Sequence, residues 1–328
     1  MKSSFKDFFP IYKESFKKDG KPYNMLAQSI NDDENKWSYF EKQLGVFTGE
    51  FTLETADSFV EQIRHFELRF TEYLVSQELK LDFSDRKRIN KMMLSALKNF
   101  YSSSKLPTES AYSINSVFNK FSFENHLYHF INFNYTGCLS KCLSTIEDGV
   151  VGTRQTDRGK KYDKIGQIIH VHGYLQNNPI MGLNDIDQIE NPDLRGSKAF
   201  TKGIVKPLQN KAIRMGYDRT ATDLINSSTI ICIYGMSLGE TDKKWWITII
   251  NWLQKDTNRH LIIFDYDEHF NRSSQFDWIS KEDKVIEKLN SFYNDNEAIE
   301  HVRERIHLAV HKNIFSLNLT EKTVLGVS

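Results

Sequence analysis

This chain of 328 residues contains few cysteines and few prolines, and its formal net charge is low. The three cysteines, Cys138, Cys142 and Cys232, are too few for a disulfide framework and fit a reducing cytoplasm better. Basic and acidic residues number 43 each, so the formal net charge is zero. This balance argues against a broad basic surface for nucleic acid and against an acidic tail, although it leaves room for a local basic patch.

Long apolar runs are also missing, as is a signal-peptide core at the N-terminus, which argues against a membrane partner. Only six prolines occur, whereas aromatic residues make up 13% of the chain and hydrophobic residues 39%. This composition is typical of a well-packed, helix-rich globular protein. No metal cofactor is expected, because Cys138 and Cys142 have no second cysteine or histidine pair with which to form a zinc site.

Residues 1–125 predict a mainly helical segment packed on a sheet. Apolar residues recur at helical spacing in residues 35–47, 55–79 and 84–101. The chain begins abruptly with Phe5, Phe8, Phe9 and Tyr12 on one face and nothing before them to pack on. We therefore expect this aromatic face to be exposed unless a preceding strand covers it.

Residues 126–328 predict an α/β core, because short apolar strands alternate with amphipathic helices. The expected strands are residues 127–133, 166–171, 229–234, 260–265 and 305–310. Residues 150–164 are polar and basic and are interpreted as a loop. Strands that alternate with helices favour one parallel, doubly wound sheet, and the two segments are expected to form a single integrated domain.

Three strand ends carry polar or small residues that suggest a site. They are Asn134-Tyr135-Thr136, His172-Gly173 and Gly235-Met236-Ser237. The third lies in the loop of a strand–loop–helix unit. In this unit Thr241 is a plausible N-cap, and Asp242 complements the helix dipole. Because the carboxyl ends of parallel strands share one edge of a sheet, the three segments are expected to converge there.

Several segments of the sequence resemble the AbiH family of bacterial phage abortive-infection proteins. They are FNYT (133–136), HVHG (170–173), IMGLND (180–185) and YGMSLGETDKKWW (234–246), with WSYFEKQL (37–44) near the start. The resemblance covers most of the chain and implies a role in phage defence. More distantly, the layout is similar to Rossmann-like, sirtuin-like NAD-binding domains.

The sirtuin-like resemblance implies roles for individual residues. Asn134 would lie near the nicotinamide ribose and His172 would be the catalytic histidine. The residues expected to bind a nucleotide are Thr136, Gly173, Gly235, Ser237 and Asp242. Cleavage of a nicotinamide–ribose bond passes through an oxocarbenium-like state and needs a base, and histidine titrates in the suitable range. Backbone N–H groups at residues 136–137 and 235–239 would bind the pyrophosphate.

The chain departs from both resemblances. AbiH members usually begin with a strand and a glycine-containing turn just before a segment like residues 4–8, and Met1 falls after it. The first strand is therefore expected to be missing, and the reading frame to extend upstream. Sirtuins also carry a zinc ribbon, for which this chain has no second cysteine pair.

Each candidate residue also has a structural interpretation. His172 fits a hydrogen-bonded histidine at a strand end, Asn134 fits a helix cap, and the glycines after residue 234 fit an ordinary turn. His170 and His172 share a strand face, but no third metal ligand is evident. Cys138 and Cys142 fit buried apolar positions. The basic residues of 150–164 fit a solvated loop, with phosphate contact as the alternative.

Two hypotheses about function follow. The first is an enzyme that binds or hydrolyses NAD or a related nucleotide during phage infection. The second is a non-enzymatic sensor or partner-binding protein with an eroded sirtuin-like fold. A phage component is a plausible trigger in either case. The retained Asn134, His172 and Ser237 favour the first hypothesis, and the missing strand favours the second.

Overall fold

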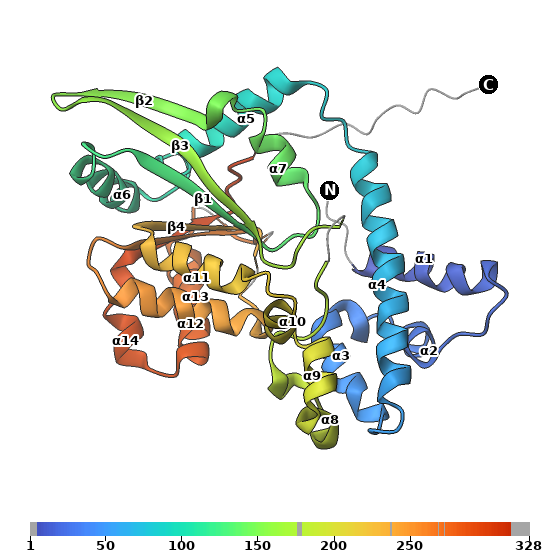
Figure 1. Ribbon diagram of the computed structural model, residues 1–328. Coiled ribbons are helices and arrows are strands. Elements are labelled where there is room, and N and C mark those ends of the chain that lie inside the picture. Colours follow the sequence, from blue (N-terminus) through green and yellow to red (C-terminus); the bar gives the residue numbers. More distant parts are fainter. Residues whose placement is uncertain (1–4, 176–178, 237, 268, 272, 316–328) are drawn as a thin grey trace.

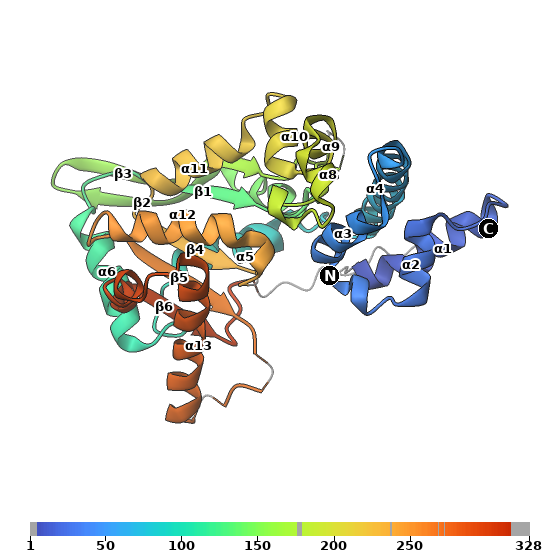
Figure 2. The same ribbon diagram turned by 90° about the horizontal axis from the view of Figure 1, so that it is seen from below.

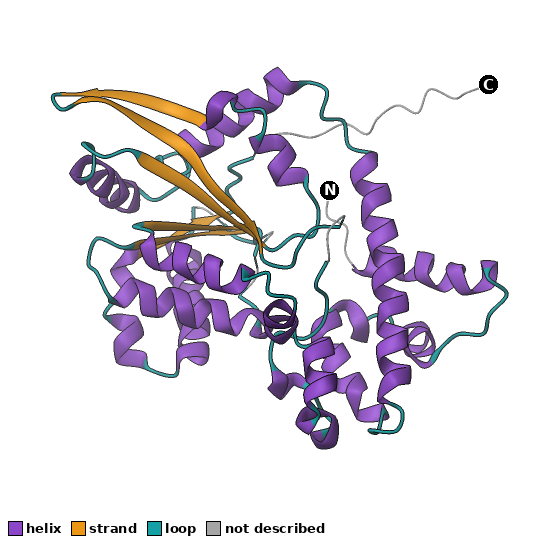
Figure 3. Cartoon of the chain, in the orientation of Figure 1, coloured by secondary structure: helices purple, strands orange, loops and turns teal. Residues whose placement is uncertain are grey.

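The computed structural model describes residues 5–175, 179–236, 238–267, 269–271 and 273–315 (Figure 1). Helices predominate, and strands occupy a smaller region (Figure 3). The first part of the chain contains α1 (Phe5–Lys18), α2 (Met25–Asp32), α3 (Phe40–Phe47), α4 (Ala56–Leu79), α5 (Arg86–Asn99) and α6 (Thr108–Lys120). Helices therefore occupy most of residues 5–120. Within the described residues, no helix combines the length and apolar character needed to cross a membrane.

The aromatic face at the start of α1 is buried, so the prediction that it is exposed was wrong. Phe8, Phe9 and Tyr12 have no solvent exposure. The ring of Phe8 packs edge-on against Phe66 and Phe70 of α4, with centroids 5.2 and 5.1 Å away. The sequence did not reveal this partner because α4 follows about 50 residues later, and only the tertiary fold brings the two helices together.

In the part of the chain that the structure describes, the strands form two sheets of three, where the sequence predicted one parallel sheet. The first contains β1 (His126–Asn132), β2 (Val150–Thr156) and β3 (Gly159–His170) in the order β1-β3-β2. In it β1 is parallel to β3, and β2 is antiparallel to β3. The second contains β4 (Ile230–Tyr234), β5 (His260–Asp265) and β6 (Ile306–Val310), all parallel. The α/β class is thus confirmed, together with one small parallel sheet.

Residues 150–164 form most of the β2–β3 hairpin, so the prediction of a loop was wrong. The turn at residues 157–159 uses Gly159 at a φ of +95°, a region that favours glycine. Across the ribbon, the Arg154 guanidinium forms an ion pair with Asp163 at 3.0 Å. The hairpin is polar on both faces because much of it lies at the outer end of the sheet (Figure 1), so it lacks the apolar alternation that identifies a half-buried strand.

Helices cover both faces of the β4–β6 sheet (Figure 2). One face packs against α11 (Tyr217–Ser227), α12 (Lys243–Gln254), α13 (Gln275–Tyr293) and α14 (Asn296–Glu300). The other face packs against α6 and Phe100. The short helix α7 (Cys138–Leu143) packs with α5, and Cys142 lies in their apolar core as expected.

Helices α1–α4 share their core with a later segment instead of with a sheet. That segment includes α8 (Pro192–Gly196) and α9 (Lys198–Ile204), and α10 (Lys206–Ala212) follows it. Leu194, Phe200 and Ile204 contribute buried side chains to this core. The chain therefore returns to its N-terminal helices after β3, which brings α3 close to the start of α10. The division at residue 125 stays a prediction.

A buried histidine pair in the parallel sheet predicts sensitivity to acid. His260 Nδ1 and His307 Nε2 lie 2.9 Å apart, and both side chains are buried. Burial, followed by the neighbouring His260, lowers the pKa of His307 from 6.5 to about 4. The unfolded chain therefore takes up the proton more readily, and the free energy of unfolding is expected to fall by roughly 3 kcal/mol between pH 6.5 and 4.

Urea unfolding at pH 7 and at pH 4.5 measures this loss. A variant with His260→Gln and His307→Gln titrates at neither position, so its free energy of unfolding should depend less on pH than that of the wild type. The same pH dependence in both proteins would contradict the prediction.

Candidate active site

The turn after β3 positions His172. The backbone N–H of Val171 still donates to the carbonyl of Asn132 at 3.0 Å, so pairing continues past the end of the strand. Gly173 then turns the chain with a φ of +71°, and its N–H donates to His170 O at 3.1 Å. His172 is 8% exposed, and its ring lies between Phe133 and Tyr135, with centroids 5.7 and 5.8 Å away. His172 is therefore fixed at the carboxyl end of β3.

Lys206 begins α10 and is almost completely buried, at 2% exposure. The chain breaks between α9 and α10 at Val205, which has extended backbone angles. A break here is expected because Pro207 cannot continue the hydrogen-bond pattern of a preceding helix. An isolated β-bridge between Leu183 and Val205 stabilises the chain at this break. Leu183 N–H donates to Ile204 O and Lys206 N–H donates to Leu183 O, both at 2.8 Å.

Glu41 in the first turn of α3 pairs with Lys206. The side-chain amide of Asn184 donates to Glu41 Oε2 at 2.9 Å and also to the carbonyl oxygen of Thr241. The carbonyl of Thr241 therefore accepts a hydrogen bond at the start of α12, and the helix begins without the predicted side-chain cap. These contacts connect α3, the Leu183 bridge, α10 and α12. We call His172, Lys206, Glu41, Asn184 and Asp242 the His172 cluster.

Burial and charge shift the pKa values of this cluster. Burial, followed by the Lys206 cation, lowers the pKa of His172 well below 6.5, so the ring is neutral at pH 7. Burial and the nearby Glu41 raise the pKa of Asp242 to about 6, against the opposing effect of Lys206. Groups with strongly shifted pKa values concentrate at functional sites. A neutral histidine can accept a proton, and a carboxyl group with a raised pKa can donate one.

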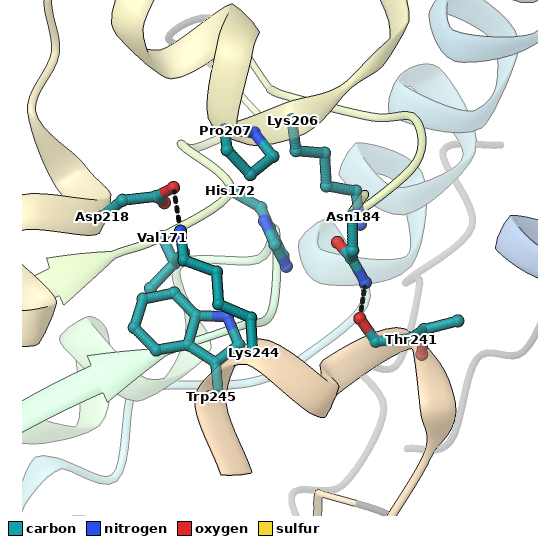
Figure 4. Close-up of a pocket in the computed structure, with 9 residues that line it drawn as sticks. All are labelled: Val171, His172, Asn184, Lys206, Pro207, Asp218, Thr241, Lys244 and Trp245. Carbon is teal, nitrogen blue, oxygen red and sulfur yellow. Dashed lines mark hydrogen bonds and ion pairs between the residues drawn. The ribbon is translucent and has the colours of Figure 1, made fainter. Parts of the chain in front are cut away.

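A small cavity adjoins the cluster (Figure 4). Its lining comprises Val171, His172, Asn184, Lys206, Pro207, Asp218, Thr241, Lys244 and Trp245. Its volume of about 10 Å³ gives room for about one water molecule. His172 Nδ1 is buried and has no hydrogen-bond partner among the described residues. An unpaired buried nitrogen is costly, so it is a natural position for a bound water or substrate atom.

Asn134 belongs to a different network from His172. Its side chain is exposed and donates to Asn132 Oδ1 at 3.2 Å, and Asn132 Nδ2 lies 3.3 Å from His170 Nδ1. The other ring nitrogen of His170 lies 3.0 Å from Ser140 Oγ. Asn134 is therefore not among the residues that line the cavity. No group of three histidine, cysteine or acidic residues suited to a metal ion occurs in the described part of the chain.

The expected nucleotide-binding residues fall in several places. Thr136 precedes Gly137, whose N–H donates to the Glu78 carboxylate at 3.1 Å and is therefore already paired. Gly173 adjoins His172. Gly235 follows β4 with a φ of +71°, and Asp242 lies near Glu41. Ser237 lies outside the described residues.

Sequence reasoning missed Glu41, Asn184 and Lys206. Glu41 lies in WSYFEKQL and Asn184 in IMGLND, two segments already singled out by their resemblance. Lys206 carries only a weak signal, the Lys-Pro pair that breaks the helix. An ion pair between residues 165 positions apart leaves no local pattern in the sequence.

The comparisons with known proteins agree with the motifs. A family model described as "Bacteriophage abortive infection AbiH" matches residues 1–266, which is most of the chain. No curated protein matches the chain significantly, and no solved structure does so either. The matched region contains every residue of the His172 cluster. The chain therefore belongs to the AbiH family of bacteriophage abortive-infection proteins.

Proposed function

We propose that this protein acts in the cytoplasm of phage-infected cells by binding and hydrolysing NAD or a related nucleotide at the His172 cluster. One observation carries the proposal. A buried, neutral histidine with an unpaired Nδ1 lies beside a buried lysine at the carboxyl end of a parallel strand, and that lysine pairs with Glu41 and lies near Asp242. Ligands of open α/β sheets bind at that end.

Each residue would have a separate role in the reaction. Nδ1 of His172 would accept a proton from the attacking water. The carboxylates of Glu41 and Asp242 would stabilise the positive charge that develops on the sugar during bond cleavage. Lys206 would hold the Glu41 carboxylate in position through their ion pair. Asn134 would orient the ribose, as in the sirtuin-like arrangement, while Thr136, Gly173, Gly235, Ser237 and Asp242 would contact the nucleotide.

Because the cavity is small, the proposed activity requires the site to open. With room for about one water molecule, the site must widen before a nucleotide can enter. The Glu41–Lys206 pair and the bond from Asn184 to Thr241 O hold three elements together across it. A phage component that separates α3 from α10 would open the site, which would confine the activity to infected cells.

Purified protein tests the proposal directly. It is incubated with NAD and a panel of nucleotides, with and without extract from phage-infected cells, and the products are separated by chromatography. We expect one nucleotide to be cleaved at its glycosidic bond, and cleavage to be faster with the infected extract. No consumption of any nucleotide under either condition would contradict the enzyme proposal.

A second candidate function is a non-enzymatic sensor or partner-binding protein. The observation that favours it is the small volume of the cavity, at whose lining Lys206 is paired with Glu41 instead of being available to a ligand. In that case the ion pair would be a switch between two packings of α3 and α10. Phage protection without any change in the nucleotide pool would support this function.

A further inference from the structure

The outer end of the β2–β3 hairpin extends beyond the rest of its sheet. β1 pairs with β3 only from Asp163 onwards, so among the described residues the segment 160–162 has β2 as its only strand partner. Figures 1 and 2 both show this two-stranded end reaching outward. We call residues 153–164 the basic ribbon, because basic residues outnumber acidic ones there: Arg154, Arg158, Lys160, Lys161 and Lys164 against Asp157 and Asp163.

One face of the basic ribbon is turned towards the rest of the protein. Arg154 forms its ion pair with Asp163 on this face, at 3.0 Å, and its guanidinium also donates to the carbonyl oxygen of Glu124 at 2.7 Å. His126 Nδ1 lies 3.1 Å from the same Asp163 carboxylate. The charges of Arg154 and Asp163 are therefore used within the fold and are not available to a partner.

The opposite face of the basic ribbon is open to solvent. Because side chains alternate along a strand, Lys160, Tyr162 and Lys164 share this face. Antiparallel pairing adds Gln155 opposite Lys160 and Thr153 opposite Tyr162. Tyr162 is half-buried, and the other four residues are exposed. This outer face thus combines cations, an aromatic ring and side chains that form hydrogen bonds.

The cations of the basic ribbon lie beside aromatic rings. Lys160 Nζ and Lys164 Nζ lie 5.2 and 5.3 Å from the centre of the Tyr162 ring. At the turn, the Arg158 guanidinium lies 4.5 Å from the centre of the Phe123 ring. None of these three cations forms an ion pair with another described residue. Exposed cations without a counter-charge attract an anionic partner.

We propose that the outer face of the basic ribbon binds single-stranded nucleic acid. Lys160 and Lys164, with Arg158 at the turn, would contact phosphate groups, and a base would stack on Tyr162. The side-chain amide of Gln155 would form hydrogen bonds with base edges. No residue of the basic ribbon lines the cavity at His172, so this proposal does not depend on nucleotide cleavage.

The exposed apolar surface favours a single strand over a duplex. Leu127 of β1 pairs with Lys164 and is 59% exposed, so it extends the outer face next to the cations. Unpaired bases offer their flat faces to Tyr162 and Leu127. In a duplex the base faces are stacked on each other, and these two side chains would have no partner.

Fluorescence anisotropy of labelled oligonucleotides tests this proposal. The full chain is titrated into oligo(dT) and oligo(U) of about 20 nucleotides, which distinguishes DNA from RNA, and into a duplex of the same length. We expect both single strands, or one of them, to bind more tightly than the duplex. Three phosphate contacts give a salt slope of about −2, so affinity should fall roughly 20-fold between about 50 and about 200 mM salt.

Two variants separate the charges from the aromatic ring. Lys160→Gln with Lys164→Gln leaves one of the three phosphate contacts, so binding should weaken roughly tenfold and the salt slope should fall to about −0.7. Tyr162→Leu should weaken binding roughly tenfold and leave the slope unchanged, because stacking carries no charge. Lys18→Gln with Lys21→Gln, at exposed positions around the end of α1, is the matched control and should bind like the wild type.

Three results would overturn the proposal, once thermal melting shows that the variants are folded. The first is the absence of binding, or equal binding by the wild type and the double variant at Lys160 and Lys164. The second is duplex binding as tight as single-strand binding and unaffected by Tyr162→Leu. The third is binding to vesicles that contain phosphatidylserine but to no oligonucleotide, which would assign the basic ribbon to a membrane surface.

Discussion

Replacing His172 with alanine is expected to lower the rate of nucleotide cleavage by roughly 10²–10⁴-fold, the usual contribution of a general acid–base group. The neutral ring is the acceptor that the proposed mechanism requires, and a methyl side chain in its place would leave the attacking water without a base. The fold should persist, because His172 follows a strand and its ring packs against Phe133 and Tyr135, which are only partly buried and lie at the margins of two cores. Thermal melting checks folding, and product analysis measures the rate.

Two matched variants separate catalysis from packing. His172→Gln fills most of the same space but cannot act as a base near neutral pH, so it should lose activity as His172→Ala does. His301 is an exposed histidine far from the cluster in the chain, and His301→Gln should retain full activity. Wild-type rates in a folded His172→Ala protein would assign His172 a structural role only.

Lys206→Met is expected to destabilise the protein by about 3 kcal/mol, because it leaves the Glu41 carboxylate without its cation. Lys206 is 3% exposed at its side chain and Glu41 24%. The partial exposure of Glu41 lets water solvate it, so we expect the low end of the range for a broken buried ion pair. Urea unfolding at pH 7 measures the change in the free energy of unfolding.

The double variant Lys206→Met with Glu41→Leu is the control. It removes both charges, and replacing a buried pair by apolar residues is often neutral, so stability should largely return. If the single and double variants are equally unstable, Lys206 acts through its packing and the two charges are not coupled.

The sequence predicted most elements from local patterns. The long helix α4 follows from Phe59, Ile63, Phe66 and Phe70 at helical spacing, and β5 follows from its apolar run. Prediction failed where the packing partner of a residue is distant in the sequence. Phe8 looked exposed because Phe66 and Phe70 become its neighbours only in the folded chain. The β2–β3 hairpin was missed because an outer polar ribbon has no alternation of apolar residues.

Only part of the candidate site could be predicted, again because some of its residues come from distant parts of the chain. His172 could be identified because it directly follows an apolar strand in an HVHG segment. Its pKa shift, however, depends on burial and on Lys206, which the chain contributes 34 residues later from the start of another helix. Asn134 was grouped with His172 by its place at a strand end, yet its side chain contacts Asn132. Position at a strand end does not fix the direction of a side chain.

The nucleotide content of phage-infected cells tests the central claim most directly. Cells that express the wild-type protein or His172→Ala are infected, and NAD and related nucleotides are quantified through the infection together with phage yield. The proposed function predicts that one nucleotide falls and phage yield drops only with the wild type. Full protection by a folded His172→Ala protein, with an unchanged nucleotide pool, would contradict it and favour the sensor.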